Sequence, residues 1–274
     1  MEPTLALFSP SPSVVAGAIA VAALYWLCTQ TYRDKFVAAT PVSTPKQIAF
    51  YGGVALALVA LASPLDTIGD KYLFTAHMLQ HLLLILGVAP LLLGGMPAWL
   101  LRELLAATRL AGFVRWARHP LVAFFGFNLI FAFAHIPVFY ELTLASEPLH
   151  AAEHVVFVLT AMLMWMPVLS PVPEISVPYP ALGQVLYLFL QTIPASLVGA
   201  LLAMASAPLY ITYELAPRLT ALGALEDQQL GGLIMWVGGG VYFLIATGVV
   251  FFAWAAREEA ANRRPGVTQG VASR

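Results

Sequence analysis

Seven apolar stretches constrain this chain more than any other feature of its sequence. A helix needs about 20 largely apolar residues to cross about 30 Å of hydrocarbon, and each stretch reaches or approaches that length. The composition agrees, because 60% of the residues are hydrophobic, only 10% are charged and the mean hydropathy is +0.83. We therefore predict an all-α polytopic membrane protein, a bundle of seven transmembrane helices that forms a single domain over residues 1–274. The stretches cover approximately residues 14–30, 47–62, 72–94, 120–139, 149–169, 182–205 and 228–255.

Basic residues are distributed unequally between the two sides that this topology implies. Eleven lysines and arginines fall in the first loop, the third loop and the tail, whereas only Lys71 and Arg218 fall on the other side. Since positive charge is retained in the cytoplasm, we predict an external N-terminus and a cytoplasmic C-terminus, with residues 256–274 as a flexible tail. The net charge of −1 conceals this polarity and argues against a nucleic-acid partner.

The segment between the third and fourth stretches, residues 97–118, alternates apolar side chains with arginines. Such a pattern is typical of an amphipathic helix that lies at a membrane surface. We predict an interfacial helix on the inner leaflet, with its arginines at anionic lipid headgroups.

Histidines gather at one depth of the predicted bundle. His77 and His81 are four residues apart and so share a helix face, and His150 and His154 repeat this spacing on the fifth helix. His135 lies late in the fourth helix, which runs in the opposite direction, and so reaches the same outer half. Because ionisable side chains are costly inside a bilayer, such a group indicates an ion path, a proton relay or a cofactor pocket.

Paired histidines from neighbouring helices are a common way for a helical bundle to bind a metal. Imidazole suits copper, zinc, iron and nickel, while thioether sulfur favours reduced copper. Met78 lies beside His77, and Met235 lies in the outer half of the seventh helix, so we predict a copper ion bound by the five histidines with Met78 and Met235. Each methionine taken alone also fits a packing role.

Carboxylates surround the predicted site. Glu153 is within a span and close to the histidines, and Asp66, Asp70, Glu141 and Glu147 lie around its outer mouth. They are expected either to orient the histidines or to attract cations.

Two other classes of protein fit part of this pattern. Histidines in a bundle also ligate haem, as in cytochrome b-like electron-transfer proteins, but the paired spacing and the lack of a second histidine layer at the inner end favour one compact ion. An ion or proton channel would need polar residues beyond Gln191 to continue the path, and the sequence offers none.

Four sequence blocks together resemble the multi-span CtaG-type cytochrome c oxidase assembly factors. The blocks are HMxQH from His77, HxPxxY from His135, HxxEH from His150 and DQQxGGxxMW from Asp227. The resemblance runs from the second helix to the seventh and implies a bacterial inner-membrane protein, not an enzyme, whose partners are cytochrome c oxidase subunits and which supplies copper during assembly. Besides the histidines and methionines, its motif positions here are Gln80, Tyr140, Glu153, Asp227, Gln228, Gln229 and Trp236, and we expect Tyr140, Glu153, Asp227, Gln228 and Gln229 to surround the metal ligands.

Overall fold

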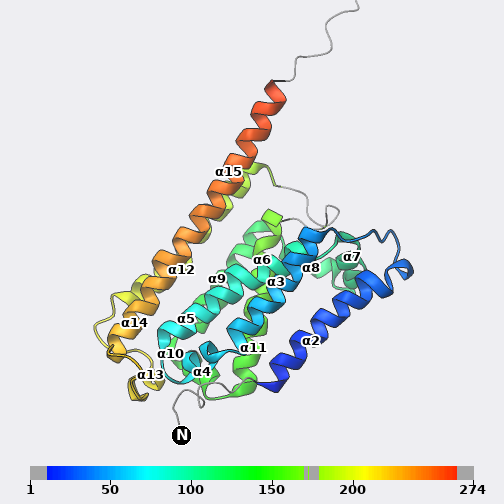
Figure 1. The fold of residues 1–274 in the computed structure, drawn as a ribbon. Coiled ribbons are helices and arrows are strands. Elements are labelled where there is room, and N and C mark those ends of the chain that lie inside the picture. Colours follow the sequence, from blue (N-terminus) through cyan, green and yellow to red (C-terminus); the bar gives the residue numbers. More distant parts are fainter. Residues whose placement is uncertain (1–10, 170–171, 173–178, 264–274) are drawn as a thin grey trace, which may run out of the picture.

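A computed structural model describes residues 11–169, 172 and 179–263 and shows only helices in them (Figure 1). The helices of the first half are α2 (Pro12–Trp26), η1 (Leu27–Thr31), η2 (Arg33–Lys35), α3 (Thr44–Leu61), α4 (Pro64–Lys71), α5 (Phe74–Leu82), η3 (Leu83–Val88), α6 (Ala89–Gly95), α7 (Ala98–Ala107), α8 (Ala111–Ala117) and α9 (Pro120–Ala134). Those of the second half are α10 (Pro137–Leu144), α11 (Glu147–Leu169), α12 (Ala181–Ala203), α13 (Ile211–Leu215), α14 (Ala224–Leu233), η4 (Ile234–Gly239) and α15 (Gly240–Asn262).

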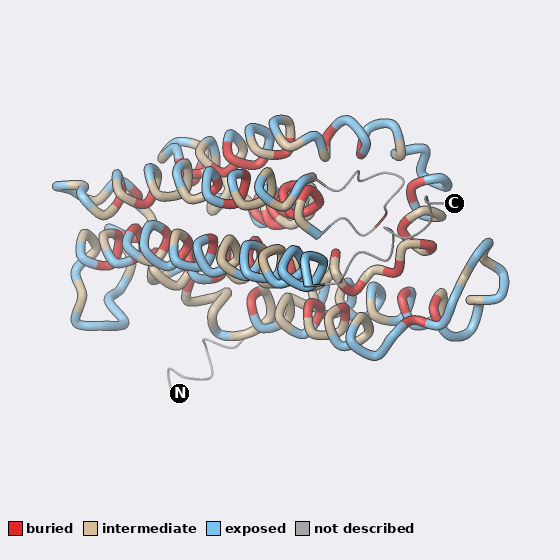
Figure 2. The backbone as a smooth tube through the Cα atoms, turned by 90° about the horizontal axis from the view of Figure 1, so that it is seen from above, coloured by how far each residue is buried: buried red, intermediate tan, exposed pale blue. Residues whose placement is uncertain are grey.

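Six continuous helical segments in the described part of the chain are long and apolar enough to cross a membrane. The fourth predicted span differs from these, because α9 has only 15 residues and reaches the required length only together with α8, from which it turns by 84°. The described residues thus provide six candidate spans, or seven if α8 and α9 form one. Apolar residues such as Ile19, Leu129 and Leu201 are exposed, as expected of a protein whose surroundings are lipid. Figure 2 shows exposed residues along the outer sides of the helices.

The continuous span of α5, η3 and α6 is the most buried of the candidate spans, and α2 lies at the edge of the bundle, against α3 (Figure 1). Tyr25 of α2 stacks on Phe50 of α3 with ring centroids 3.7 Å apart, and its hydroxyl donates a hydrogen bond to the Gly95 carbonyl. On the opposite edge α12 and α15 lie side by side, and the end of α15 projects beyond the other helices.

The helices α12 and α14 approach each other so closely that only glycine fits between them. A Cβ atom on Gly199 would lie 2.7 Å from the carbonyl oxygen of Gly232, and one on Gly232 would lie 2.5 Å from the backbone nitrogen of Ala203. Both distances are far below van der Waals contact, so these glycines set the spacing of the two helices.

Pro90 explains the π-helical segment η3, which follows the first histidine pair. A proline has no N–H, and its ring displaces the preceding turn, so the carbonyls of Ile85 and Leu86 lose their partners within the helix. The indole of Trp165 on α11 donates to the Ile85 carbonyl at 3.1 Å, and the hydroxyl of Tyr242 on α15 donates to the Leu86 carbonyl at 2.6 Å. Side chains of two other helices thus satisfy backbone groups that lipid could not.

Two connecting segments differ from the sequence-based expectations. Residues 97–118 form two short helices, α7 and α8, rather than one, because Arg109 between them adopts the left-handed backbone conformation (φ 56°). Residues expected to form the loop before the third span form the short helix α4, which begins with Pro64 and whose N-cap, Ser63, accepts a hydrogen bond from Leu65.

The first part of the predicted C-terminal tail, residues 256–274, is helical. The structure continues α15 to Asn262, so residues 256–262 of the predicted tail are helical. Residues 264–274 lie outside the described residues.

Candidate metal centre

The start of α5 is fixed by Asp227 of α14. The carboxylate of Asp227 accepts hydrogen bonds from the backbone N–H of Phe74 at 2.7 Å and of Thr75 at 3.2 Å, and the Thr75 hydroxyl donates to its carbonyl at 2.9 Å. A carboxylate at this position satisfies free N–H groups and complements the helix dipole. The helix that carries the first histidine pair is thereby attached to α14 one turn before His77.

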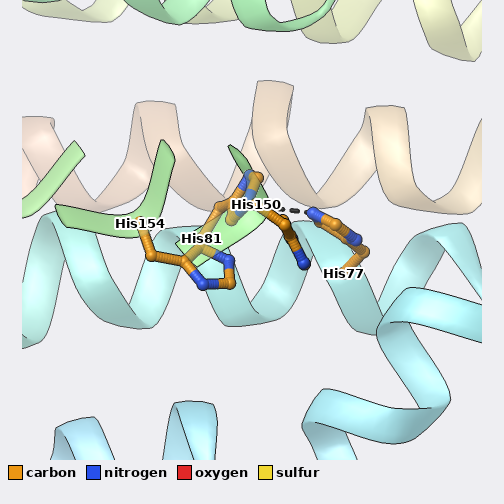
Figure 3. Close-up of side chains that lie close together, drawn as sticks. All are labelled: His77, His81, His150 and His154. Carbon is orange, nitrogen blue, oxygen red and sulfur yellow. Dashed lines mark hydrogen bonds between the residues drawn. The ribbon is translucent and has the colours of Figure 1, made fainter. Parts of the chain in front are cut away.

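Four histidines from two helices converge in the interior (Figure 3). His77 and His81 project from α5, and His150 and His154 project from α11; each is buried, with at most 7% of its surface exposed. Each offers one ring nitrogen such that all four lie within 4.8 Å of one another. The two i,i+4 pairs therefore face each other, as the sequence spacing predicts.

The nitrogens in this cluster have few partners within the protein. The Nε2 atoms of His77 and His81 are 3.0 Å apart, while Nδ1 of His81 and the Nε2 atoms of His150 and His154 are buried without a hydrogen-bond partner. Buried polar atoms are nearly always paired. Three unpaired nitrogens in one group fit a metal ion, which would engage lone pairs that no protein donor engages.

Tyr213 of α13 determines which nitrogen of His77 faces the cluster. Its hydroxyl donates to the Gly69 carbonyl at 2.8 Å, so its oxygen accepts from Nδ1–H of His77, 3.0 Å away. The hydroxyl of Tyr140 completes the arrangement by donating to Tyr213 at 2.8 Å. With its proton on Nδ1, His77 presents the lone pair of Nε2 to the other histidines, as metal binding requires.

Asp70 of α4 lies close to one histidine of α5 and to one histidine of α11. Its carboxylate oxygens lie 3.5 Å from Nδ1 of His150 and 3.8 Å from Nδ1 of His77. A carboxylate on the far nitrogen of a histidine raises the basicity of the ligating nitrogen and orients the ring. Asp70 is thus placed to support one histidine from each pair.

Asp66, one turn before Asp70, also faces the site through Gln80. The Gln80 amide donates to Asp66 at 2.7 Å and to the Ala60 carbonyl at 3.0 Å. Burial, reinforced by the charge of Asp70, raises the pKa of Asp66 to about 6.

Comparison with known protein families identifies the chain. The model of the cytochrome c oxidase caa3 assembly factor family matches residues 23–257, which is most of the sequence. The chain belongs to this family. No curated protein and no solved structure matches it.

His135, the fifth histidine predicted as a ligand of this assembly factor, lies beside the group of four and not within it. Its Nδ1–H donates to the Phe131 carbonyl at 2.6 Å, and its own carbonyl accepts from Tyr210 at 2.9 Å. The Nε2 atom is buried and has no partner. His135 ends α9 just before Pro137, at the break that the sequence predicts.

The two predicted methionine ligands of the assembly factor are both buried in the main hydrophobic core. The Cγ atom of Met78 lies 3.4 Å from the position of a Cβ on Gly231, and the Cβ atom of Met235 lies 3.1 Å from that of a Cβ on Gly199. These contacts are packing contacts with α14 and α12.

The remaining predicted residues have different positions. Tyr140 and Asp227 support the histidines as described above, whereas Gln228 and Gln229 bind backbone groups of Leu209 and Ala205, at 2.6 and 3.0 Å, and so hold the segment after α12. Glu153 has one buried carboxylate oxygen without a partner. Trp236 is 39% exposed.

Sequence reasoning missed Tyr213. It lies in a five-residue helix, 136 positions after His77, and no periodicity or spacing links the two. The available signal was a single tyrosine in the outer segment between two spans, which is too weak to assign a role.

Proposed function

We propose that this oxidase assembly factor binds a copper ion at His77, His81, His150 and His154 and delivers it to cytochrome c oxidase. The observation that carries the proposal is the convergence of four buried imidazoles whose ligand atoms lie within 4.8 Å of one another. The copper is cargo in this proposal, and no catalytic step is assigned to the protein.

The distances between the histidine nitrogens fit a single transition-metal ion such as copper. With metal–nitrogen bonds of about 2.0–2.1 Å, four tetrahedral ligands lie about 3.3 Å apart, so modest side-chain rotations would close the group around one ion. Imidazole alone also suits zinc, iron and nickel. Because the family takes part in the assembly of cytochrome c oxidase, we favour copper over zinc, iron and nickel.

The same geometry disfavours haem and a channel. The axial ligands of one haem come from opposite faces of a flat ring, whereas here four nitrogens share one small volume. The next side chains inward on the two helices, Leu84 and Phe157, are apolar and fully buried, so the polar path does not continue.

We place the cluster in the outer half of a bacterial inner membrane, with the N-terminus outside and the amphipathic α7–α8 segment at the cytoplasmic surface. The asymmetric distribution of lysine and arginine supports this orientation. The histidine pairs lie within the first two turns of α5 and of α11, which start from the same end of the bundle as α2.

Metal analysis of purified protein tests the proposal. Wild-type protein from copper-supplemented membranes should retain close to one copper per chain and show no haem absorption bands. The variant with His77→Ala and His81→Ala should lose it, while His119→Ala, a residue outside the cluster, should bind as wild type. Equal copper content in all three proteins would contradict the proposed site. Haem absorption bands would show that the protein binds haem, the alternative cofactor, instead of copper.

A further inference from the structure

The four histidines are buried, so an ion needs a path to them. A cavity of about 880 Å³ lies between α2, α3, α4 and α11. This volume is in the range of ligand-sized cavities, about 300–1,000 Å³. His150 and His154 line it, whereas His77 and His81 do not.

The polar residues of the cavity gather at one end. Asp66, Thr67, Asp70 and Lys71 come from α4, and Glu147 comes from the first turn of α11. Lys71 and Glu147 are exposed, so the cavity is open to the surface there. The deeper wall is apolar and includes Val54, Val88 and Val158.

Charge at this mouth favours cations. Three carboxylates face one lysine among the lining residues, and clefts lined by one sign of charge concentrate ions of the opposite sign. A second, independent observation points to a ligand: the Nε2 atoms of His150 and His154 on the cavity wall are buried without a partner, and so is one carboxylate oxygen of Asp70.

We propose that this cavity is the route by which a transition-metal cation reaches the site, passing from the carboxylates of Asp66, Asp70 and Glu147 to the α11 histidines before the α5 histidines. The proposal rests on the proposed function. Asp70 is the last oxygen ligand on the route, since it lies 3.5 Å from Nδ1 of His150. The exchange at each step replaces an oxygen ligand or water by a neutral imidazole nitrogen, so no redox partner is required.

Gly17 offers a way to block the route. It lines the cavity from α2, and a Cβ placed on it would meet no atom within 4 Å, so a larger side chain can start there without a clash at its Cβ. Gly52 on α3 also has open space around its Cβ but does not line the cavity, and it is the matched control.

Rates of metal loading test the proposal. The probe is Co²⁺, whose imidazole complexes absorb visible light, mixed with the purified full chain in lipid nanodiscs. Gly17→Phe should slow both association and dissociation about tenfold or more and leave the dissociation constant close to that of wild type. Gly52→Phe should behave as wild type.

Removing charge gives a second, milder test. The double variant Asp66→Asn with Glu147→Gln should lower the association rate constant by about tenfold at low salt, with a smaller effect at high salt because the charges are then screened. Glu214→Gln, an exposed carboxylate outside the cavity lining, is the control.

The outcomes separate this proposal from the proposed function. Wild-type loading rates in Gly17→Phe and in the charge variant would overturn the route while leaving the metal site intact. The route is also wrong if Gly17→Phe changes only the amount of lipid that copurifies. Wild-type protein that binds neither Co²⁺ nor copper would instead overturn the histidine site itself.

Discussion

The hydroxyl of Tyr213 lies 3.0 Å from Nδ1 of His77 and is fixed by the carbonyl of Gly69 on its other side. A residue of a short helix between two spans thus sets the tautomer of a histidine inside the bundle. His77, a proposed ligand, is thus oriented by the segment that carries Tyr213. A hydrogen bond from the Leu209 N–H to Gln228 of α14 holds that segment in position.

Tyr213→Phe removes this orientation without changing the shape of the site. We expect metal affinity to fall about 10–100-fold, as is usual when the partner of a metal-bound histidine is lost. Titration of purified protein with the metal would measure the change. Tyr242→Phe, which removes a tyrosine hydrogen bond to Leu86 away from the histidines, should leave affinity unchanged. Equal affinities in the two variants would show that Tyr213 does not orient the ligand.

Replacing either histidine pair by alanine should lower the copper content and the activity of the client oxidase. Each double variant removes two ligands, while the apolar surface of the bundle stays the same, so membrane insertion should persist. Copper per oxidase, measured in membranes with equal amounts of the factor, is the readout. Added copper should restore part of the loss because mass action offsets weak binding, and His119→Ala should match wild type. Full oxidase copper in well-expressed pair variants would rule out delivery through these residues.

Gly199→Ala and Gly232→Ala should destabilise the protein. Each new methyl group would lie 2.7 Å or less from backbone atoms of the facing helix, and overpacking of this kind costs about 1–3 kcal/mol. Thermal unfolding in detergent measures the loss. Gly248→Ala on α15 has no atom within 4 Å of the new Cβ and should be neutral or slightly stabilising. A similar melting temperature for all three variants would mean that α12 and α14 are not held this closely.

Stability should fall as pH rises through the range in which Asp66 ionises. Its pKa is raised from 3.8 to about 6, chiefly by burial, so the folded state holds the proton more tightly than the unfolded state. The stabilisation is complete below about pH 4 and is lost as the pH passes about 6. Asp66→Asn retains an acceptor for Gln80 and should remove this component. The melting temperature of wild type relative to Asp66→Asn should therefore decrease between pH 4 and pH 7, and a constant difference would contradict the assigned pKa.

Periodicity and spacing predict much of this structure. Apolar length predicts the helices, within a few residues for α3, α11 and α12, and the i,i+4 spacing predicts that each histidine pair shares a face. Pro137 predicts the break after His135. These features are local, so the sequence carries them directly.

Features that depend on tertiary contact were not predictable in the same way. His135 matches the depth of the other histidines, but its Nδ1 is bound to Phe131 and it falls outside the group of four. The helix α4 is short and polar, and its role comes from where Asp70 meets two other helices. The division of residues 97–118 follows from one left-handed residue, Arg109, whose conformation no hydrophobic pattern reveals.

Pro90 has a mechanical consequence for the proposed release of metal. By freeing the Ile85 carbonyl, which the Trp165 indole then binds, it joins the helix of His77 and His81 to the helix of His150 and His154 through a hydrogen bond about one turn after His81 and about three turns after His154. The two halves of the site are therefore braced against separation. We expect cargo to leave by exchange of one imidazole at a time with an incoming ligand, while the helices that hold the site stay together.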